Sequence, residues 1–159
     1  MNQNTQVPEL LQLAEQACIK NNARLTQKRR QVLTLLLHLN KAISAYELIE
    51  LFKTSFSETL PPMTVYRALE FLEKMQLAHR LNTENKYIAC SHIGCESSHE
   101  LPHFLICQRC LRVDELNNDT VHSLCELTNR VEQTGYQLSS PQIELNGICD
   151  KCLLSDNSD

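Results

Sequence analysis

Two Cys-x-x-Cys pairs constrain this 159-residue chain more than any other feature. The first pair is Cys107 and Cys110, the second is Cys149 and Cys152, and 38 residues separate them. In each pair, one tight turn can present both thiolates to the same metal ion, and two such turns complete a tetrahedral shell of four sulfurs. The spacing therefore predicts a structural zinc site that fixes the fold of the C-terminal half and leaves no coordination position open for catalysis.

The alternatives for these cysteines are two surface disulfides or two redox-active pairs. A redox pair is expected once, at the start of a helix that follows a strand, whereas here the motif occurs at both ends of one segment. The residues from Met1 to Glu9 lack the basic start and apolar stretch of an export signal, and no apolar run is long enough to span a membrane. We therefore expect a cytoplasmic location, where thiols bind metals.

Charge divides the chain near residue 90. Residues 1–90 carry eleven Lys and Arg against eight Asp and Glu, a net charge of +3, and residues 91–159 carry four against eleven, a net charge of −7. Such a shift predicts two domains. The positive half is suited to a polyanion, whereas the acidic half would be repelled by one.

Helical spacing of apolar residues and one alternating segment predict a winged helix-turn-helix at residues 1–90. Helices are expected at 8–22, from Thr26 onward, at 45–52 and at 64–75, with a β-hairpin at about 77–90. Ser44 and Glu47 have the spacing of a capping box that opens the third helix. The fourth helix would enter the major groove of DNA, and the hairpin would lie beside the DNA backbone.

Arg67 is the leading candidate for a base contact, because its planar guanidinium can bond guanine O6 and N7 together. The densest basic patch lies around the start of the second helix. Two interpretations of this patch stand side by side, namely contact with DNA phosphates and an ordinary solvated surface. The predicted DNA-binding residues are Arg67, Tyr66, Tyr46, Thr64, Arg24 and Lys28. The alternative is a small helical domain with ordinary polar surface residues.

Residues 91–103 form a predicted hinge and metal-binding loop, residues 104–153 a dimerisation domain, and residues 154–159 a polar tail. The chain as a whole is expected to be α+β, with a small α/β dimerisation domain. That domain has predicted strands at 104–107, 112–116, 136–138 and 142–145 and a helix from Asp119 or Thr120 to Gln133 that Gly135 terminates. A small sheet pinned by zinc has exposed edges, and pairing them across a two-fold axis would make a homodimer.

A second group of metal-binding side chains lies between the two predicted domains. It comprises His79, Cys90, His92, Cys95, His99, His103 and Glu115. Such a mixed set binds a metal more reversibly than four thiolates do, and one thiolate with imidazoles favours Zn²⁺ over Fe²⁺. The string from His99 to His103 matches the His-Glu-x-x-His motif of zinc proteases, but Pro102 prevents the continuous helix that this chemistry needs. The motif of zinc deaminases is missing too.

Taken together, the motifs resemble the ferric uptake regulator superfamily of bacterial metal-sensing repressors, and its zinc uptake regulator branch most closely. The resemblance covers about residues 8–153. It is carried by the segments Arg24–Thr26, Ile43–Tyr46 and Thr64–Leu72 and by the two Cys-x-x-Cys pairs. The run Thr64-Val65-Tyr66-Arg67 in front of two such pairs is highly specific.

The resemblance implies a homodimer that binds pseudo-palindromic operators in double-stranded DNA and represses zinc-uptake genes when zinc is plentiful. It implies two Zn²⁺ per subunit, one structural at the four paired cysteines and one regulatory at His79, Cys90, His99 and Glu115. His103 is the alternative to His99, because the loop between Cys90 and Cys107 is longer than the family pattern. The iron-sensing branch usually has a histidine-rich run just before the first cysteine pair. In this chain the corresponding residues 100–104 include one histidine, which speaks against iron sensing.

The resulting hypothesis is that structural zinc keeps the dimer intact, while regulatory zinc binds last and ties the hairpin to the dimerisation domain. This closure would match the two DNA-reading heads to half-sites about one helical turn apart. We call the form with the hairpin tied to the dimerisation domain the closed form. To shift the population decisively to this form, zinc must favour it over the open form by about 5 kcal/mol. The alternatives are a sensor of iron, manganese, nickel or peroxide with the same architecture, a zinc-dependent hydrolase or deaminase, and a protein-interaction module stabilised by zinc.

Overall fold

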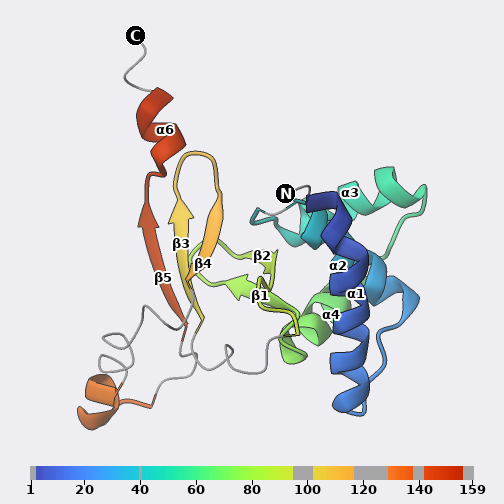
Figure 1. Ribbon diagram of the computed structural model, residues 1–159, viewed down its shortest axis with the longest axis horizontal. Helices are drawn as coiled ribbons and strands as arrows, with labels where there is room; N and C mark the ends of the chain where they lie inside the picture. Colours follow the sequence, from blue (N-terminus) through green and yellow to red (C-terminus); the bar gives the residue numbers. More distant parts are fainter. Residues whose placement is uncertain (1–2, 40, 95–101, 117–128, 138–141, 156–159) are drawn as a thin grey trace. The chain divides into compact units, whose positions relative to one another are not determined.

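The computed structural model describes residues 3–39, 41–94, 102–116, 129–137 and 142–155 (Figure 1). The chain divides into two compact units, Met1–Gly94 and Cys95–Asp159. The first unit extends four residues past the boundary proposed at residue 90, because Ile93 is buried in its apolar core. Among the described residues, no helix has both the length and the apolar character needed to cross a membrane.

Four helices build most of the first unit. They are α1 (Gln3–Lys20), α2 (Gln27–Leu39), α3 (Ala45–Phe56) and α4 (Pro62–Lys74). The predicted start of α2 after Thr26 is confirmed. The predicted start of α4 at Thr64 is wrong by two residues, because Pro62 occupies the first helical position, where no partner is needed for the N–H that proline lacks. The predicted end of α3 at Phe52 is wrong too, since the helix continues for one more turn.

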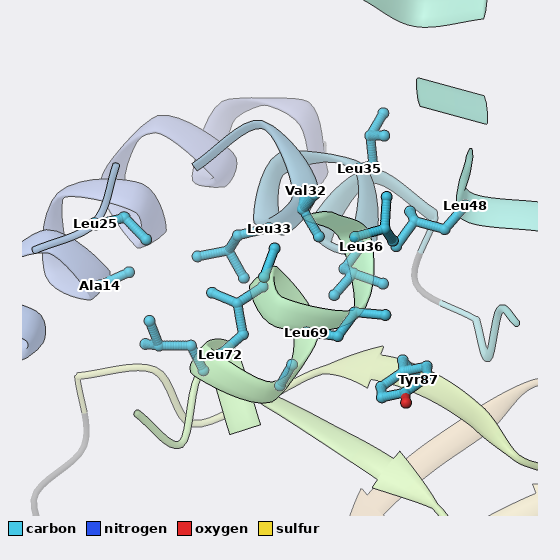
Figure 2. Packing of buried hydrophobic residues seen from close by; sticks show 14 of the residues in the cluster. Ala14, Leu25, Val32, Leu33, Leu35, Leu36, Leu48, Leu69, Leu72 and Tyr87 are labelled. Atoms are coloured by element: carbon cyan, nitrogen blue, oxygen red, sulfur yellow. The ribbon is translucent and has the colours of Figure 1, made fainter. Parts of the chain in front are cut away.

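The apolar faces of these helices meet in one core. Figure 2 shows Leu33 and Leu36 of α2 pointing toward Leu69 and Leu72 of α4, and all four side chains are fully buried. Burial of one such leucine contributes roughly 1.5–3 kcal/mol relative to its exposure to water. The core therefore fixes the orientation of α4, whose opposite face is left for solvent or a ligand.

The predicted hairpin is present and completes the first unit as a winged helix. Strands β1 (Ala78–Leu81) and β2 (Lys86–Ala89) pair antiparallel, and Asn85 takes the left-handed conformation that a tight turn needs, with φ of 50°. An isolated bridge joins Ile43 to Tyr87 of β2 through two backbone hydrogen bonds of 3.0 and 2.8 Å. The bridge holds the hairpin against the helical part.

The second unit contains a three-stranded sheet in the order β4-β3-β5. The strands are β3 (His103–Cys107), β4 (Val113–Leu116) and β5 (Ile143–Gly147), followed by the short helix α6 (Asp150–Ser155). Strand β3 is antiparallel to β4 and parallel to β5. With the winged helix before it, this unit confirms the α+β class predicted from the sequence.

Three predictions for the second unit have different outcomes. Residues 129–133 are helical and are followed by Gly135 with φ of +90°, as expected for the end of the predicted helix, whereas its part at 119–128 lies outside the described residues. The strand expected at 136–138 is wrong at Tyr136 and Gln137, which form no strand, and residue 138 is outside the described residues. Helix α6 was not predicted.

Candidate metal centres and DNA interface

The two Cys-x-x-Cys pairs converge on one point in the second unit. Cys107 ends β3 and Cys149 follows β5, and because these strands are parallel, with Cys107 opposite Gly147, both pairs lie at the same end of the sheet. The Sγ atoms of Cys107 and Cys152 are 3.9 Å apart, and those of Cys110 and Cys149 are 3.7 Å apart. All four Sγ atoms lie within 4.8 Å of one another.

These separations fit a tetrahedral zinc ion and exclude disulfides. A disulfide brings its two sulfurs to about 2.05 Å. In contrast, Zn–S bonds of about 2.3 Å in a tetrahedron place the sulfurs about 3.8 Å apart. The structure therefore brings the four predicted cysteines together at separations that suit a tetrahedral zinc ion.

Backbone amides prepare this cluster for a cation. Hydrogen bonds from the backbone of Cys110, and then of Cys149, lower the pKa of Cys107 to about 6. The amide N–H of Cys149 donates to Cys107 Sγ at 3.4 Å. The neighbouring sulfurs have the opposite effect on Cys152 and raise its pKa to about 12. Four adjacent thiols cannot all ionise unless a cation offsets their charge, which is what a divalent metal supplies.

A second pair of metal-binding side chains lies at the base of the hairpin, within the first unit. His79 pairs with Ile88, and the amide of Cys90 donates to Leu77 O at 3.0 Å. By this register His79 and Cys90 are diagonal neighbours on one face of the hairpin, and their ligand atoms lie within 4.8 Å of each other. Cys90 is only 2% exposed and its sulfur accepts a hydrogen bond from the His92 amide at 3.4 Å.

The register of the second unit separates the other candidate ligands. Glu115 lies opposite Phe104, and His103 lies opposite Leu116. Because neighbouring residues of a strand point to opposite faces, Glu115 shares a face of the sheet with Phe104, whereas His103 lies on the other face. His103 is fully buried there. His99 and Cys95 lie outside the described residues.

The exposed face of α4 carries the predicted DNA-reading residues. Val65, Leu69 and Leu72 are buried, as predicted, and the side chains on the opposite face are exposed. They recur at helical spacing and are Met63, Tyr66, Arg67 and Glu70. On α3, Tyr46 is 72% exposed. Arg67 and Tyr46 are therefore accessible to DNA, while Thr64 is half-buried.

The basic residues at the start of α2 are engaged within the first unit. Lys28 pairs with Glu58 and lies 5.6 Å from the centre of the Phe52 ring. Arg29 donates to Arg24 O at 2.9 Å.

Two further contacts tie the same helix to its neighbours. The Arg29 guanidinium lies 3.6 Å from the centre of the Phe71 ring of α4, and Arg30 donates to Glu15 Oε2 of α1 at 2.9 Å. These contacts brace α2 against α1 and α4. Lys28 would have to leave Glu58 to contact a phosphate, and Arg24 has its side chain exposed.

Sequence analysis did not single out Met63, which is 61% exposed on the same face of α4 as Arg67. The signal was available in the spacing, because Met63 is four residues before Arg67 and falls on the same side of the helix. A helix that begins at Thr64, as predicted from the sequence, leaves Met63 in a loop, whereas the observed helix begins at Pro62.

The chain is similar to known proteins over most of its length. A family model described as the ferric uptake regulator family matches residues 20–146. The zinc uptake regulation protein of Escherichia coli (strain K12) is 35% identical over 151 residues, which cover 95% of this chain and 85% of that protein. The ferric uptake regulation protein of Bacillus subtilis (strain 168) is 24% identical over 129 residues, which cover 81% of this chain and 85% of that protein.

A solved structure matches over almost the same length. The structure of a zinc uptake regulator complexed with zinc and DNA has a TM-score of 0.82 and 33% identity to this chain, over 95% of this chain and 97% of that one. The similarity therefore includes both the winged helix and the sheet with its cysteine cluster.

Proposed function

The chain belongs to the ferric uptake regulator family, and on that premise we propose that it is a zinc-responsive transcriptional repressor that binds operator DNA as a homodimer. Its targets are the promoters of zinc-uptake genes, and its place of action is the cytoplasm. The family's members regulate transcription, and no catalytic step is part of the proposal. Two zinc ions per subunit are required, one structural and one regulatory.

The observation that carries this proposal is the pair of His79 and Cys90 at the base of the hairpin. An imidazole and a thiolate on one face of the DNA-binding unit are two of the ligands that zinc takes most readily. Their position allows a metal to act on the orientation of the hairpin. The sulfur quartet is a separate cluster in the second unit, whose four sulfurs leave no ligand position open.

We assign the remaining regulatory ligands to Glu115 and His99 of the second unit. The strand register supports this choice over His103, because His103 and Glu115 lie on opposite faces of the sheet. A metal that takes ligands from both units would restrict their relative motion. The cost of ordering the DNA-binding heads is then met by zinc, so that DNA affinity rises.

Zinc-dependent operator binding tests this function. We expect the zinc-loaded protein to bind operator DNA from its own zinc-uptake promoters at least tenfold more tightly than protein treated with a mild chelator, as measured by fluorescence anisotropy. His79→Ala and Cys90→Ser should remain folded and dimeric but lose this response, because the regulatory site is broken. His38→Ala is the matched control, since His38 is an exposed histidine of α2 outside the hairpin.

The metal count provides a second test. Native mass spectrometry should find two zinc ions per subunit before mild chelation and one afterwards, and His79→Ala should begin at one. Competing Fe²⁺, Mn²⁺ and Ni²⁺ in the binding experiment distinguishes a zinc sensor from its relatives. Equal operator affinity of wild type, His79→Ala and Cys90→Ser under zinc would reject the regulatory assignment.

A further inference from the structure

The exposed face of α4 carries a cationic side chain, Arg67, and an apolar one, Met63. Met63 and Arg67 are four residues apart, so they lie on the same side of the helix, and both are exposed. The buried side of α4 is fully used by the core of the first unit, and Met63 takes no part in that core. Met63 is therefore an unbranched apolar side chain exposed to water beside an arginine that is proposed to bind DNA. A ligand that covers it removes apolar surface from water, which favours binding.

We propose that Met63 determines operator specificity by contacting the C5-methyl group of a thymine in the major groove. This inference rests on the proposed function, because it requires α4 to enter the groove. Thymine is the base that presents a methyl group there, and apolar side chains are the groups that recognise it. Arginine reads guanine through O6 and N7 on the same edge, so the two residues together recognise two different base pairs.

The helical geometry restricts where that thymine lies. Four residues of an α-helix span about 6 Å along its axis, and neighbouring base pairs are about 3.4 Å apart. The thymine contacted by Met63 is therefore within about two base pairs of the guanine contacted by Arg67. A sequence preference of this kind depends on the start of α4 at Pro62, which places Met63 in the first helical turn.

Replacement of single thymines by uracil tests the contact directly, because uracil lacks only the methyl group. The probe is an operator selected from a random DNA library by the zinc-loaded full-length protein. Each thymine is replaced in turn, and each guanine by 7-deazaguanine, which lacks the N7 acceptor. For wild type we expect one thymine per half-site at which uracil weakens binding about fourfold, the effect of losing one buried methyl group.

Variants assign that effect to a residue. Met63→Ala should bind the thymine and uracil operators with equal affinity at this position and keep its sensitivity to 7-deazaguanine, which Arg67→Ala should lose. Ile19→Ala is the matched control, because Ile19 is an exposed apolar residue of α1, 67% accessible, and should preserve the wild-type profile. Tyr46→Ala separates the contribution of the exposed tyrosine, and should preserve the uracil effect assigned to Met63.

The outcomes distinguish this inference from the proposed function. If wild type selects no sequence from the library, the proposed function fails and this inference fails with it. If it selects a sequence but its binding does not depend on zinc, the zinc response of the proposed function fails, and the uracil profile still decides the role of Met63. If binding is specific and zinc-dependent but Met63→Ala has the same uracil profile as wild type, only the inference about Met63 is overturned. A sensitive thymine more than about two base pairs from the sensitive guanine would also overturn it.

Discussion

Leu111 adopts a backbone conformation that usually belongs to glycine. Its φ of 60° lies in the left-handed region, and its amide donates to Cys107 O at 3.0 Å to close the turn of the first cysteine pair. A side chain with a Cβ atom in this region costs on the order of 1 kcal/mol. The turn brings Cys107 and Cys110 to the same cluster of four sulfurs.

This strain predicts a reversal of the usual effect of glycine. In most positions glycine is less stabilising than alanine, because it loses more conformational freedom on folding. We expect zinc-loaded Leu111→Gly to be more stable than Leu111→Ala by about 1 kcal/mol, since only glycine relieves the strain and both variants lose the same leucine packing. Thermal unfolding of the two variants at equal zinc concentration measures the difference. The opposite order of stability would show that the turn is unstrained.

Local spacing allowed the sulfur quartet to be predicted, whereas the mixed site depends on tertiary structure. Two cysteines separated by two residues reach one metal from a single turn, so no knowledge of the sheet was needed. The grouping of His79 with Cys90 came from the family resemblance, and the register of the hairpin makes them diagonal neighbours. The separation of His103 from Glu115 required the register of β3 and β4, since a slip of one residue would exchange the faces.

At the level of elements, the capping box of α3 is complete. The Ser44 hydroxyl accepts a hydrogen bond from the Glu47 amide at 3.3 Å, and the Glu47 carboxylate accepts from the Ser44 amide at 2.8 Å and from its hydroxyl at 2.6 Å. These hydrogen bonds lower the pKa of Glu47. The start of α3 positions the exposed side chain of Tyr46, a predicted DNA contact.

We expect Ser44→Ala to reduce the free energy of unfolding by about 1 kcal/mol. Because the pKa of Glu47 is lowered in the folded state, its ionised form stabilises the protein above the unfolded value near 4.5, and this contribution is lost as the pH falls through the lower folded value. The stability difference between wild type and Glu47→Gln should therefore shrink from pH 6 to pH 3.5. Urea unfolding followed by far-UV circular dichroism measures both effects. A difference independent of pH would contradict this role.

Elements with strong local signals were predicted, and elements that depend on tertiary contacts were not. Ser44 and Glu47 define the start of α3 by themselves. Tyr136 and Gln137 alternate in polarity like a strand yet form none, because a strand requires a partner on its edge and the described sheet ends at β4 and β5. Asp150 lies inside a Cys-x-x-Cys motif, where a loop is expected, so the short helix α6 that begins at this residue was not predicted.

At the scale of the whole molecule, the two units are stabilised by different means. The core of the first unit draws on all four helices and both strands of the hairpin. In the described part of the second unit, the buried apolar residues are few: Phe104, Ile106, Cys107 and Val113. So small a core requires another source of stability, and structural zinc can contribute roughly 10 kcal/mol or more to a small domain.

Loss of structural zinc should therefore unfold one unit and leave the other intact. Calorimetry of Cys110→Ser is expected to show the transition of the first unit at the wild-type temperature, with the transition of the second unit abolished or shifted down by tens of degrees. The helical circular dichroism signal of α1 to α4 should persist. The reciprocal variant is Cys18→Ser, because Cys18 is fully buried in the core of the first unit and a buried hydroxyl is destabilising.

Cys18→Ser should lower only the transition of the first unit and should not change the amount of tightly bound zinc, which metal analysis can verify. The two serine variants are matched in chemistry and differ only in the unit that they perturb. If each lowered both transitions equally, the protein would unfold as one cooperative body, and zinc would stabilise the DNA-binding unit as well. Separate transitions would mean that the first unit, with His79 and Cys90 at the base of its hairpin, folds without structural zinc.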